Sequence, residues 1–279
     1  MTEIGIMQGR LVPPVDARFQ AFPRDRWRDE FPAAAEAGLN FIEWIFDEYG
    51  FDSNPLRTDA GIAELRALTD RYGIAIPSVC ADYFMERPLL KCSRAEQDER
   101  MAILSRLFAR AKQLGIHHIV LPFVDASRMD SEDEIDRFVA LANDVLMPIA
   151  EQHEIEAHLE TSLPPKEVAG ILDRIPHPLF WINYDSGNSS SLGYPPVEEF
   201  GAYGHRIGSF HIKDRVKGGG TVPLGTGDAD FVTLKRCLGD YGYSRAYVLQ
   251  VARGEAGQEV AWARNNVQLA KELVIPTRG

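Results

Sequence analysis

The chain has 279 residues, of which 45% are hydrophobic and 25% charged, and its formal net charge is −11 at pH 7. The length suits one α/β barrel, since such barrels take about 250 residues. The acidity disfavours nucleic acid as a partner, because phosphate backbones are bound by clustered Lys and Arg. With no signal-peptide pattern, no run near the roughly 18 apolar residues of a membrane span and no Cys-x-x-Cys spacing, we expect a cytoplasmic protein without membrane contact.

Short apolar runs alternate with longer amphipathic runs along the whole chain. Predicted strands span Ile4–Gln8, Phe41–Phe46, Ala75–Ala81, His118–Phe123, Ile155–Glu160, Phe180–Asp185, Ile207–Ile212 and Ala246–Val251. Predicted helices span Asp25–Ala37, Asp59–Tyr72, Ser93–Gly115, Ser131–His153, Pro165–Ile175, Pro196–Tyr203, Phe231–Tyr241 and Gly257–Leu273. Ser93 and Glu96 form the capping-box pattern Ser-x-x-Glu.

Eight strand-then-helix units in strict alternation imply a parallel sheet, because each crossover returns the chain to the same edge. Eight is also the number of strands that closes a barrel filled by side chains. The predicted fold class is therefore α/β, a (β/α)₈ TIM barrel, with residues 1–279 as a single domain. A doubly wound open sheet ranks lower, since no Gly-x-Gly-x-x-Gly follows the first strand.

Polar residues fall at the carboxyl ends of the predicted strands, where barrels of this kind carry their active sites. Strands five to eight end with Glu160, Asp185, His211 and Gln250 in turn. Alone, each reads as a helix cap, a turn residue or a core histidine. Together on successive strands they favour a cation site, and oxygen-rich ligands with one nitrogen suit Mn²⁺, Mg²⁺ or Co²⁺, with Zn²⁺ also compatible.

Further polar residues near these strand ends are candidates for substrate contacts. They are Gln8, Arg10, Glu43, His158, Asn188, Asp214 and Arg253. Lys213 and Arg253 could hold a phosphate or orient hydroxyls, although Lys213 could equally pair with a nearby carboxylate. Arg10 could reach the same anion or form a surface ion pair. The glycine-rich stretch 218–227 allows either a phosphate cradle or a mobile loop.

Three segments carry a family resemblance: Tyr184–Asn188, Phe210–Arg215, and Val222–Gly227 followed by Asp230 and Phe231. In them the sequence resembles the xylose-isomerase-like barrels of the sugar phosphate isomerase/epimerase group, and most of all the hexulose-phosphate epimerase branch. The resemblance implies a divalent metal held by Glu160, Asp185 and His211, with Gln250 where the family has a fourth ligand, glutamate. The related endonuclease IV barrels have histidine where this chain has Asn188, which disfavours DNA repair.

The glutamine at position 250 bears on the reaction. A glutamine can offer a carbonyl oxygen to a metal but cannot exchange a proton near neutral pH. In family epimerases two glutamates act on opposite faces of the substrate, so the resemblance with Gln250 favours one-base isomerisation through an enediolate, with Glu160 as acid and base. Another residue could restore the second base and hence epimerisation; Lys213 is the catalytic candidate, beside Glu43, Asp47 and Asp214.

Two other readings stay open, a metal-dependent dehydratase or lyase and a non-catalytic sugar-binding barrel. The expected partner is a small sugar or sugar phosphate. A homodimer is left open.

Overall fold

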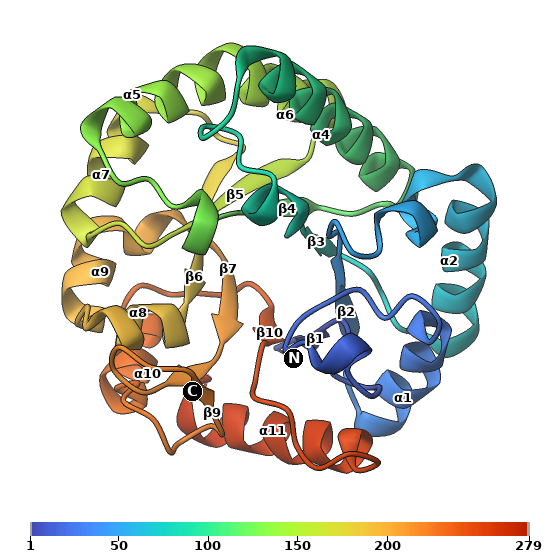
Figure 1. Ribbon diagram of the computed structural model, residues 1–279. Helices are drawn as coiled ribbons and strands as arrows, with labels where there is room; N and C mark the ends of the chain where they lie inside the picture. Colours follow the sequence, from blue (N-terminus) through green and yellow to red (C-terminus); the bar gives the residue numbers. More distant parts are fainter. Residues whose placement is uncertain (1, 278–279) are drawn as a thin grey trace.

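Eight parallel strands close into a barrel in the order β1-β10-β7-β6-β5-β4-β3-β2 in the computed structural model, which describes residues 2–277 (Figure 1). The strands are β1 (Ile4–Met7), β2 (Phe41–Ile45), β3 (Ser78–Cys80), β4 (His118–Phe123), β5 (Glu156–Thr161), β6 (Phe180–Asp185), β7 (Ile207–Ile212) and β10 (Tyr247–Leu249). A short antiparallel hairpin of β8 (Asp214–Arg215) and β9 (Thr221–Val222) follows β7. The predicted (β/α)₈ barrel is confirmed.

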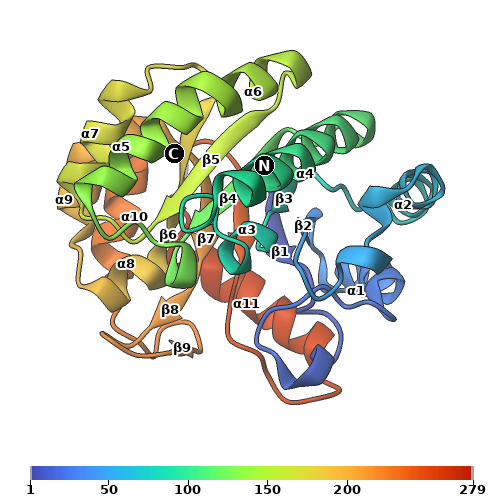
Figure 2. The same cartoon turned by 45° about the horizontal axis from the view of Figure 1, so that its top comes forward.

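Helices form an outer ring around these strands (Figure 1). They are α1 (Glu30–Ala37), α2 (Asp59–Tyr72), α4 (Arg94–Leu114), α5 (Glu132–Leu141), α6 (Met147–His153), α7 (Pro165–Arg174), α9 (Pro196–Tyr203), α10 (Phe231–Asp240) and α11 (Glu259–Leu273). Two short helices, α3 (Tyr83–Glu86) and α8 (Ser186–Leu192), instead follow the ends of β3 and β6. The tilted view shows α8 and the β8–β9 hairpin beyond the ends of β6 and β7 (Figure 2). In the described part of the chain, no helix has the length and apolar character that crossing a membrane requires.

Most element boundaries agree with the predicted ones, and β4, β6, β7, α2 and α9 agree to the residue. The capping box of Ser93 and Glu96 is present at the start of α4. Gly38, Gly73 and Gly115 adopt positive φ angles of 76°, 66° and 74° at the ends of α1, α2 and α4. Glycine reaches this left-handed conformation without a steric penalty, which ends each helix at that residue.

Two predicted elements differ because of prolines. The third strand begins at Ser78 rather than Ala75, since Pro77 has no N–H for the ladder and only an isolated bridge joins Ala75 to Phe41. The predicted helix Ser131–His153 is interrupted by a π-helical segment at Ala142–Leu146. Pro148 lies just beyond that segment and cannot donate the regular helical hydrogen bond, which accounts for the widened turn.

Helix α8 was not predicted. Asp185-Ser-Gly-Asn188 reads as a turn, but Asp185 caps a helix that starts at Ser186. Its carboxylate accepts hydrogen bonds from the backbone N–H groups of Gly187 and Asn188. An aspartate in this position satisfies helix donors that would otherwise lack partners.

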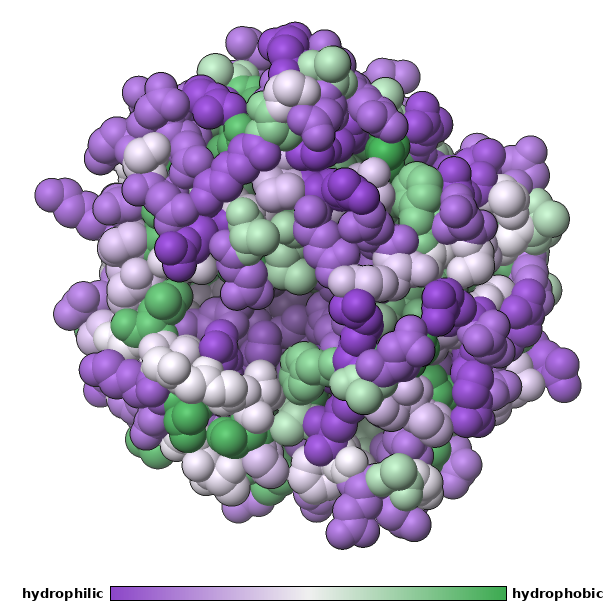
Figure 3. All heavy atoms as spheres, in the orientation of Figure 1, coloured by the Kyte–Doolittle hydropathy of each residue, from purple (hydrophilic) through white to green (hydrophobic). Residues whose placement is uncertain are grey.

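The part of the barrel interior nearest the candidate site is lined by polar side chains. Large apolar side chains such as Phe31, Phe108 and Phe200 pack the core, whereas buried polar side chains of β2, β5, β6 and β7 face one another inside the barrel. The face of the molecule seen in Figure 1 is hollowed at its centre, where hydrophilic residues gather (Figure 3). Buried polar groups must find partners, so this interior requires a defined hydrogen-bond pattern.

Candidate metal centre

Three of the predicted ligands converge. Glu160 lies near the end of β5, Asp185 ends β6 and His211 is in β7, where it is the register partner of Asp185. All three side chains are buried, and one ligand atom from each lies within 4.8 Å of the others. Adjacent parallel strands end at the same edge of the barrel, which is how residues far apart in sequence come to share one point.

Two asparagines hold Glu160. The side-chain amide of Asn183 donates to Oε2 at 2.8 Å, and that of Asn188 donates to Oε1 at 2.8 Å. Each carboxylate oxygen thus has one amide partner and keeps a further lone pair. The prediction placed Asn188 against substrate; in this structure it fixes Glu160.

His211 is oriented from across the barrel. Its Nε2 lies 2.6 Å from Oε1 of Glu43, and the other Glu43 oxygen accepts from the Ser78 hydroxyl at 2.7 Å. Strands β2 and β7 are not neighbours in the sheet, so this contact crosses the interior. With Nε2 facing Glu43, Nδ1 faces the ligand cluster and lies 3.4 Å from Oε2 of Glu160. A carboxylate that fixes the far nitrogen of a ligating histidine is a common partner in metal sites.

The charge around His211 favours a cation. Burial alone would lower its pKa, but the carboxylates of Glu43 and Glu160 outweigh burial and raise the pKa to about 10. The two carboxylates therefore favour positive charge at this buried position. A divalent cation held by Glu160, Asp185 and His211 would supply this positive charge. Two carboxylates with one imidazole suit Mn²⁺, Mg²⁺, Co²⁺ or Zn²⁺. The residues present thus fit such an ion.

Lys213 lies beside the cluster and links two predicted ligands. Its Nζ is 3.1 Å from Oδ2 of Asp185 and 2.9 Å from the carbonyl oxygen of Gln250. A Cβ at position 187 would lie 2.6 Å from Lys213 Cγ, so Gly187 leaves the room in which this side chain lies. The carbonyl oxygen of Gln250, expected on the metal, here accepts a hydrogen bond from the ammonium group.

Arg10 and Arg253, which the sequence suggested as contacts for a bound anion, both donate hydrogen bonds to the loop after β1. Arg10 donates to the carbonyl oxygens of Val251 and Phe19, at 3.0 and 2.9 Å, and Arg253 donates to Phe19 and Val12, at 3.0 and 3.2 Å. Burial, with the nearby charge of Arg253, lowers the pKa of Arg10 to about 9. Both guanidinium groups hold the segment after β1 in this structure, and their role in anion binding stays a prediction.

The glycine-rich stretch after β7 is folded onto Asp214. This buried carboxylate accepts hydrogen bonds from the backbone N–H groups of Gly225, Gly227 and Ala229. The amides of Gly225 and Gly227 thus already have a carboxylate partner in this structure. A substrate contact by Asp214 stays a prediction.

His158 and Gln8, two further candidates for substrate contacts, are both fully buried. His158 is fully buried further down the barrel, where its ring stacks on that of His118 with centroids 4.1 Å apart. Gln8 accepts from the backbone N–H of Ile45 at 2.9 Å and is fully buried. Both residues belong to the interior scaffold.

The sequence reading missed Asn183 and Ser209. Each lies two residues before a predicted ligand, Asp185 or His211, and therefore on the same face of its strand. Asn183 donates to Glu160, and Ser209 donates to Asn183 at 2.6 Å. Because side chains two residues apart on a strand face the same side, this spacing could have identified both residues from the sequence.

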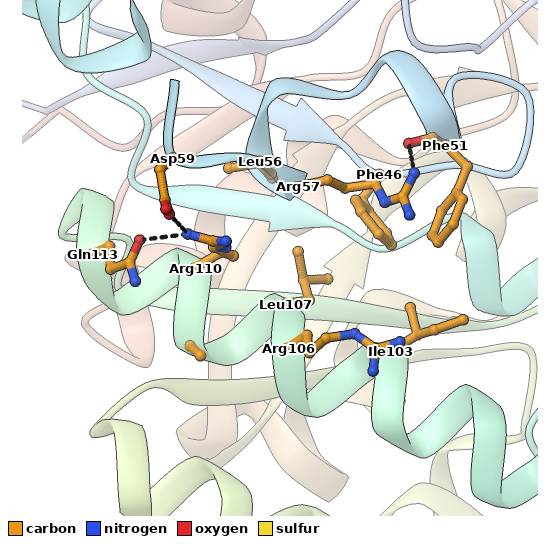
Figure 4. A pocket seen from close by; sticks show the side chains of 11 residues that line it. Phe46, Phe51, Leu56, Arg57, Asp59, Ile103, Arg106, Leu107, Arg110 and Gln113 are labelled. Carbon is orange, nitrogen blue, oxygen red and sulfur yellow. Dashed lines mark hydrogen bonds and ion pairs between the residues drawn. The ribbon is translucent and has the colours of Figure 1, made fainter. Parts of the chain in front are cut away.

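A separate cavity of about 550 Å³ lies outside the barrel between α2 and α4, lined in part by Phe51, Leu107 and Arg110 (Figure 4). Arg110 contacts Asp59 and Gln113 there, and Arg57 donates to the carbonyl oxygen of Phe51. None of the predicted site residues lines this cavity. It is therefore distinct from the ligand cluster.

The chain resembles known proteins in sequence and in fold. A model of the family described as xylose isomerase-like TIM barrel matches residues 31–273. L-ribulose-5-phosphate 3-epimerase UlaE of Escherichia coli is 24% identical over 254 residues, which cover 87% of this chain and 89% of that protein.

Two solved structures share the fold. D-psicose 3-epimerase with D-tagatose, from Clostridium cellulolyticum, has a TM-score of 0.75 at 16% identity and covers 99% of this chain and 100% of its own. The IOLI protein with a binding zinc atom has a TM-score of 0.74 at 16% identity, covering 98% of this chain and 99% of its own.

Proposed function

The chain belongs to the xylose isomerase-like TIM barrel family, and on this basis we propose that it is an enzyme that isomerises or epimerises a sugar or sugar phosphate. The observation that carries the proposal is the buried cluster of Glu160, Asp185 and His211, whose ligand atoms lie within 4.8 Å of one another. These three side chains would hold a divalent cation. The names of its relatives, a sugar-phosphate epimerase and a free-sugar epimerase, support this substrate class.

The chemistry requires a proton to leave the carbon next to a carbonyl group and to return. When bound, the cation would withdraw charge from the carbonyl and hydroxyl oxygens and so stabilise the enediolate. Glu160 is the acid and base that moves the proton. Asn183 and Asn188 hold its two oxygens in a fixed orientation, which favours proton transfer because little rearrangement is then needed.

Gln250 decides how many bases the site has. Its amide cannot take up a proton, so position 250 supplies no second base, and Glu160 is left as the proposed carboxylate base. One base on one face suffices to move a proton between the first two carbons of a sugar, which is aldose–ketose isomerisation. This reaction is the first candidate.

Epimerisation is the second candidate, and the position of Lys213 favours it. Its ammonium group lies 2.9 Å from Gln250, at the place where the resemblance expects the second glutamate. A lysine there could return a proton to the opposite face of the substrate. The relatives named as 3-epimerases point to the same reaction.

Proton exchange in heavy water tests the proposal. The protein is stripped with a chelator, reloaded separately with Mn²⁺, Mg²⁺, Co²⁺ or Zn²⁺, and incubated with ketoses and ketose phosphates while NMR follows deuterium uptake. We expect uptake at carbon 1 or 2 for isomerisation, or at carbon 3 with an inverted product for epimerisation, and its loss in Glu160→Gln. Water loss with a new carbonyl signal would instead show a lyase, and metal and sugar binding without exchange would show a binding protein.

A further inference from the structure

A chain of hydrogen bonds runs through the barrel interior from the amino ends of the strands to the candidate site. Its five members, in order, are Glu156, His158, Ser209, Asn183 and Glu160. The successive links measure 2.9, 2.8, 2.6 and 2.8 Å. Arg245 anchors the far end through a paired contact with Glu156, one bond of which is 3.0 Å long.

The middle of this chain is shielded from water. The exposed fractions are 0% for His158, 3% for Ser209 and 3% for Asn183. Barrels of this kind usually fill their interior with branched apolar side chains. A buried polar chain is unfavourable unless each member is paired, so its geometry is strongly determined.

The direction of the bonds fixes the amide of Asn183. Its nitrogen donates to the carboxylate of Glu160, while its oxygen accepts from the hydroxyl of Ser209. Turning the amide over would place its oxygen against the carboxylate of Glu160, which can only accept. Ser209 donates to the amide oxygen and so anchors Asn183 in the orientation that holds Glu160.

The same amide nitrogen touches a second member of the cluster. Asn183 Nδ2 lies 3.1 Å from Nδ1 of His211 as well as 2.8 Å from Glu160. The register between β6 and β7 shifts between Ile182 and Asn183, so the strand pairing is irregular at this position. One amide thus sets the spacing of two of the three proposed ligands.

We infer that Asn183 and Ser209 are positioning residues, which hold Glu160 and His211 at the spacing that the cation and the substrate require; this inference rests on the proposed function. An amide does not relay a proton as an imidazole or a hydroxyl does, so the chain acts by geometry. Ser209 acts through Asn183 and touches neither ligand itself.

A double-mutant cycle of Ser209→Ala and Asn183→Ala tests the inference. Two quantities are measured in each variant, the dissociation constant of Mn²⁺ by calorimetry and kcat with KM for the sugar found active. We expect each single substitution to weaken Mn²⁺ binding and lower kcat roughly 10- to 100-fold, the range for partners that orient metal ligands, with KM little changed. Because Ser209 acts through Asn183, the double variant should be no worse than Asn183→Ala alone.

Ser127→Ala is the matched control, since Ser127 is a buried serine whose hydroxyl bonds only the backbone of Pro122 and Val124 among the described residues. It should leave both quantities unchanged. Independent, additive losses in the double variant, or a Ser209→Ala protein with wild-type Mn²⁺ binding and kcat, would overturn the positioning role. Failure of the wild-type protein to bind any of the four cations and to exchange protons would instead contradict the proposed function.

Discussion

The ammonium nitrogen of Lys213 lies 2.9 Å from the carbonyl oxygen of Gln250. The same nitrogen lies 3.1 Å from Asp185. A positive charge thus lies between an amide that cannot act as a base and a carboxylate of the proposed metal cluster. Under the proposed function, this arrangement would determine whether a second face of the substrate can exchange protons.

Restoring a carboxylate at position 250 should change the reaction. In Gln250→Glu the new side chain would pair with Lys213 and offer a second base, and a well-placed base contributes roughly 10²- to 10⁴-fold to proton transfer. We expect the rate of epimerisation relative to isomerisation to rise at least tenfold, measured by NMR of the products in heavy water. Gln250→Met, which removes the amide without adding a base, should show no such rise; equal product ratios in all three proteins would contradict the one-base mechanism.

Removing the ammonium group should separate metal binding from turnover. In Lys213→Met the cluster loses a neighbouring positive charge, so Mn²⁺ should bind at least as tightly as in the wild-type protein. If Lys213 returns a proton, kcat for epimerisation should fall by about 10²-fold. Calorimetry and steady-state rates measure the two effects, and the exposed Lys217→Met is the control. Unchanged kcat would assign Lys213 a purely electrostatic role.

Glu43 should matter for metal binding although it is not a proposed ligand. Its carboxylate fixes His211 from across the barrel at 2.6 Å. In Glu43→Gln the charge is lost and an amide nitrogen would face either His211 or the Ser78 hydroxyl. We expect Mn²⁺ affinity to fall roughly 10- to 100-fold in calorimetry. Glu48→Gln, on the loop after β2, should bind Mn²⁺ normally; equal affinity in the two variants would argue against this role for Glu43.

Glu30 should give the folding stability a pH dependence. Burial raises the pKa of this carboxyl to about 8, although the backbone N–H groups of Gly9 and Leu11 bond to it and act in the opposite direction. The folded state therefore keeps a proton that the unfolded state loses above its own pKa near 4.5. Between these two values the free energy of unfolding should fall as pH rises, by on the order of 4 to 5 kcal/mol for this group.

Comparison with Glu30→Gln isolates that slope. Urea unfolding at pH 5, 7 and 9 should show the variant gaining stability relative to the wild-type protein as pH rises, because glutamine has no proton to lose. Glu36→Gln, an exposed position on the same helix, should keep a constant difference from the wild-type protein. A constant difference for Glu30→Gln as well would contradict the raised pKa.

The fold could be predicted because its signals are local. Apolar runs, capping residues and helix-ending glycines lie within a few residues of the boundaries that they set, and Ser93 or Gly73 acts as its sequence neighbourhood implies. The errors at Pro77 and Pro148 arose where a missing N–H altered an otherwise regular pattern. Helix α8 was missed because the same short polar residues favour turns and helix starts.

The candidate site could be predicted only in part. The rule that sites form at the carboxyl ends of strands was sufficient to select Glu160, Asp185 and His211. The contact between Glu43 and His211 joins residues 168 positions apart across the barrel, and no local pattern reports it. The contacts of Arg10 and Arg253 with the loop after β1 could not be predicted for a related reason, since the residues next to each arginine do not indicate the path of that loop.

Asp185 has two structural roles, as the cap of α8 and as a proposed metal ligand. Oδ1 binds the first N–H groups of α8, while Oδ2 faces Lys213. Any replacement at this position would have to preserve a helix start as well as a ligand, so loss of activity there would not by itself reveal which was lost. Because one oxygen of Asp185 caps α8, we expect aspartate to be retained at this position even in a related protein that binds no metal.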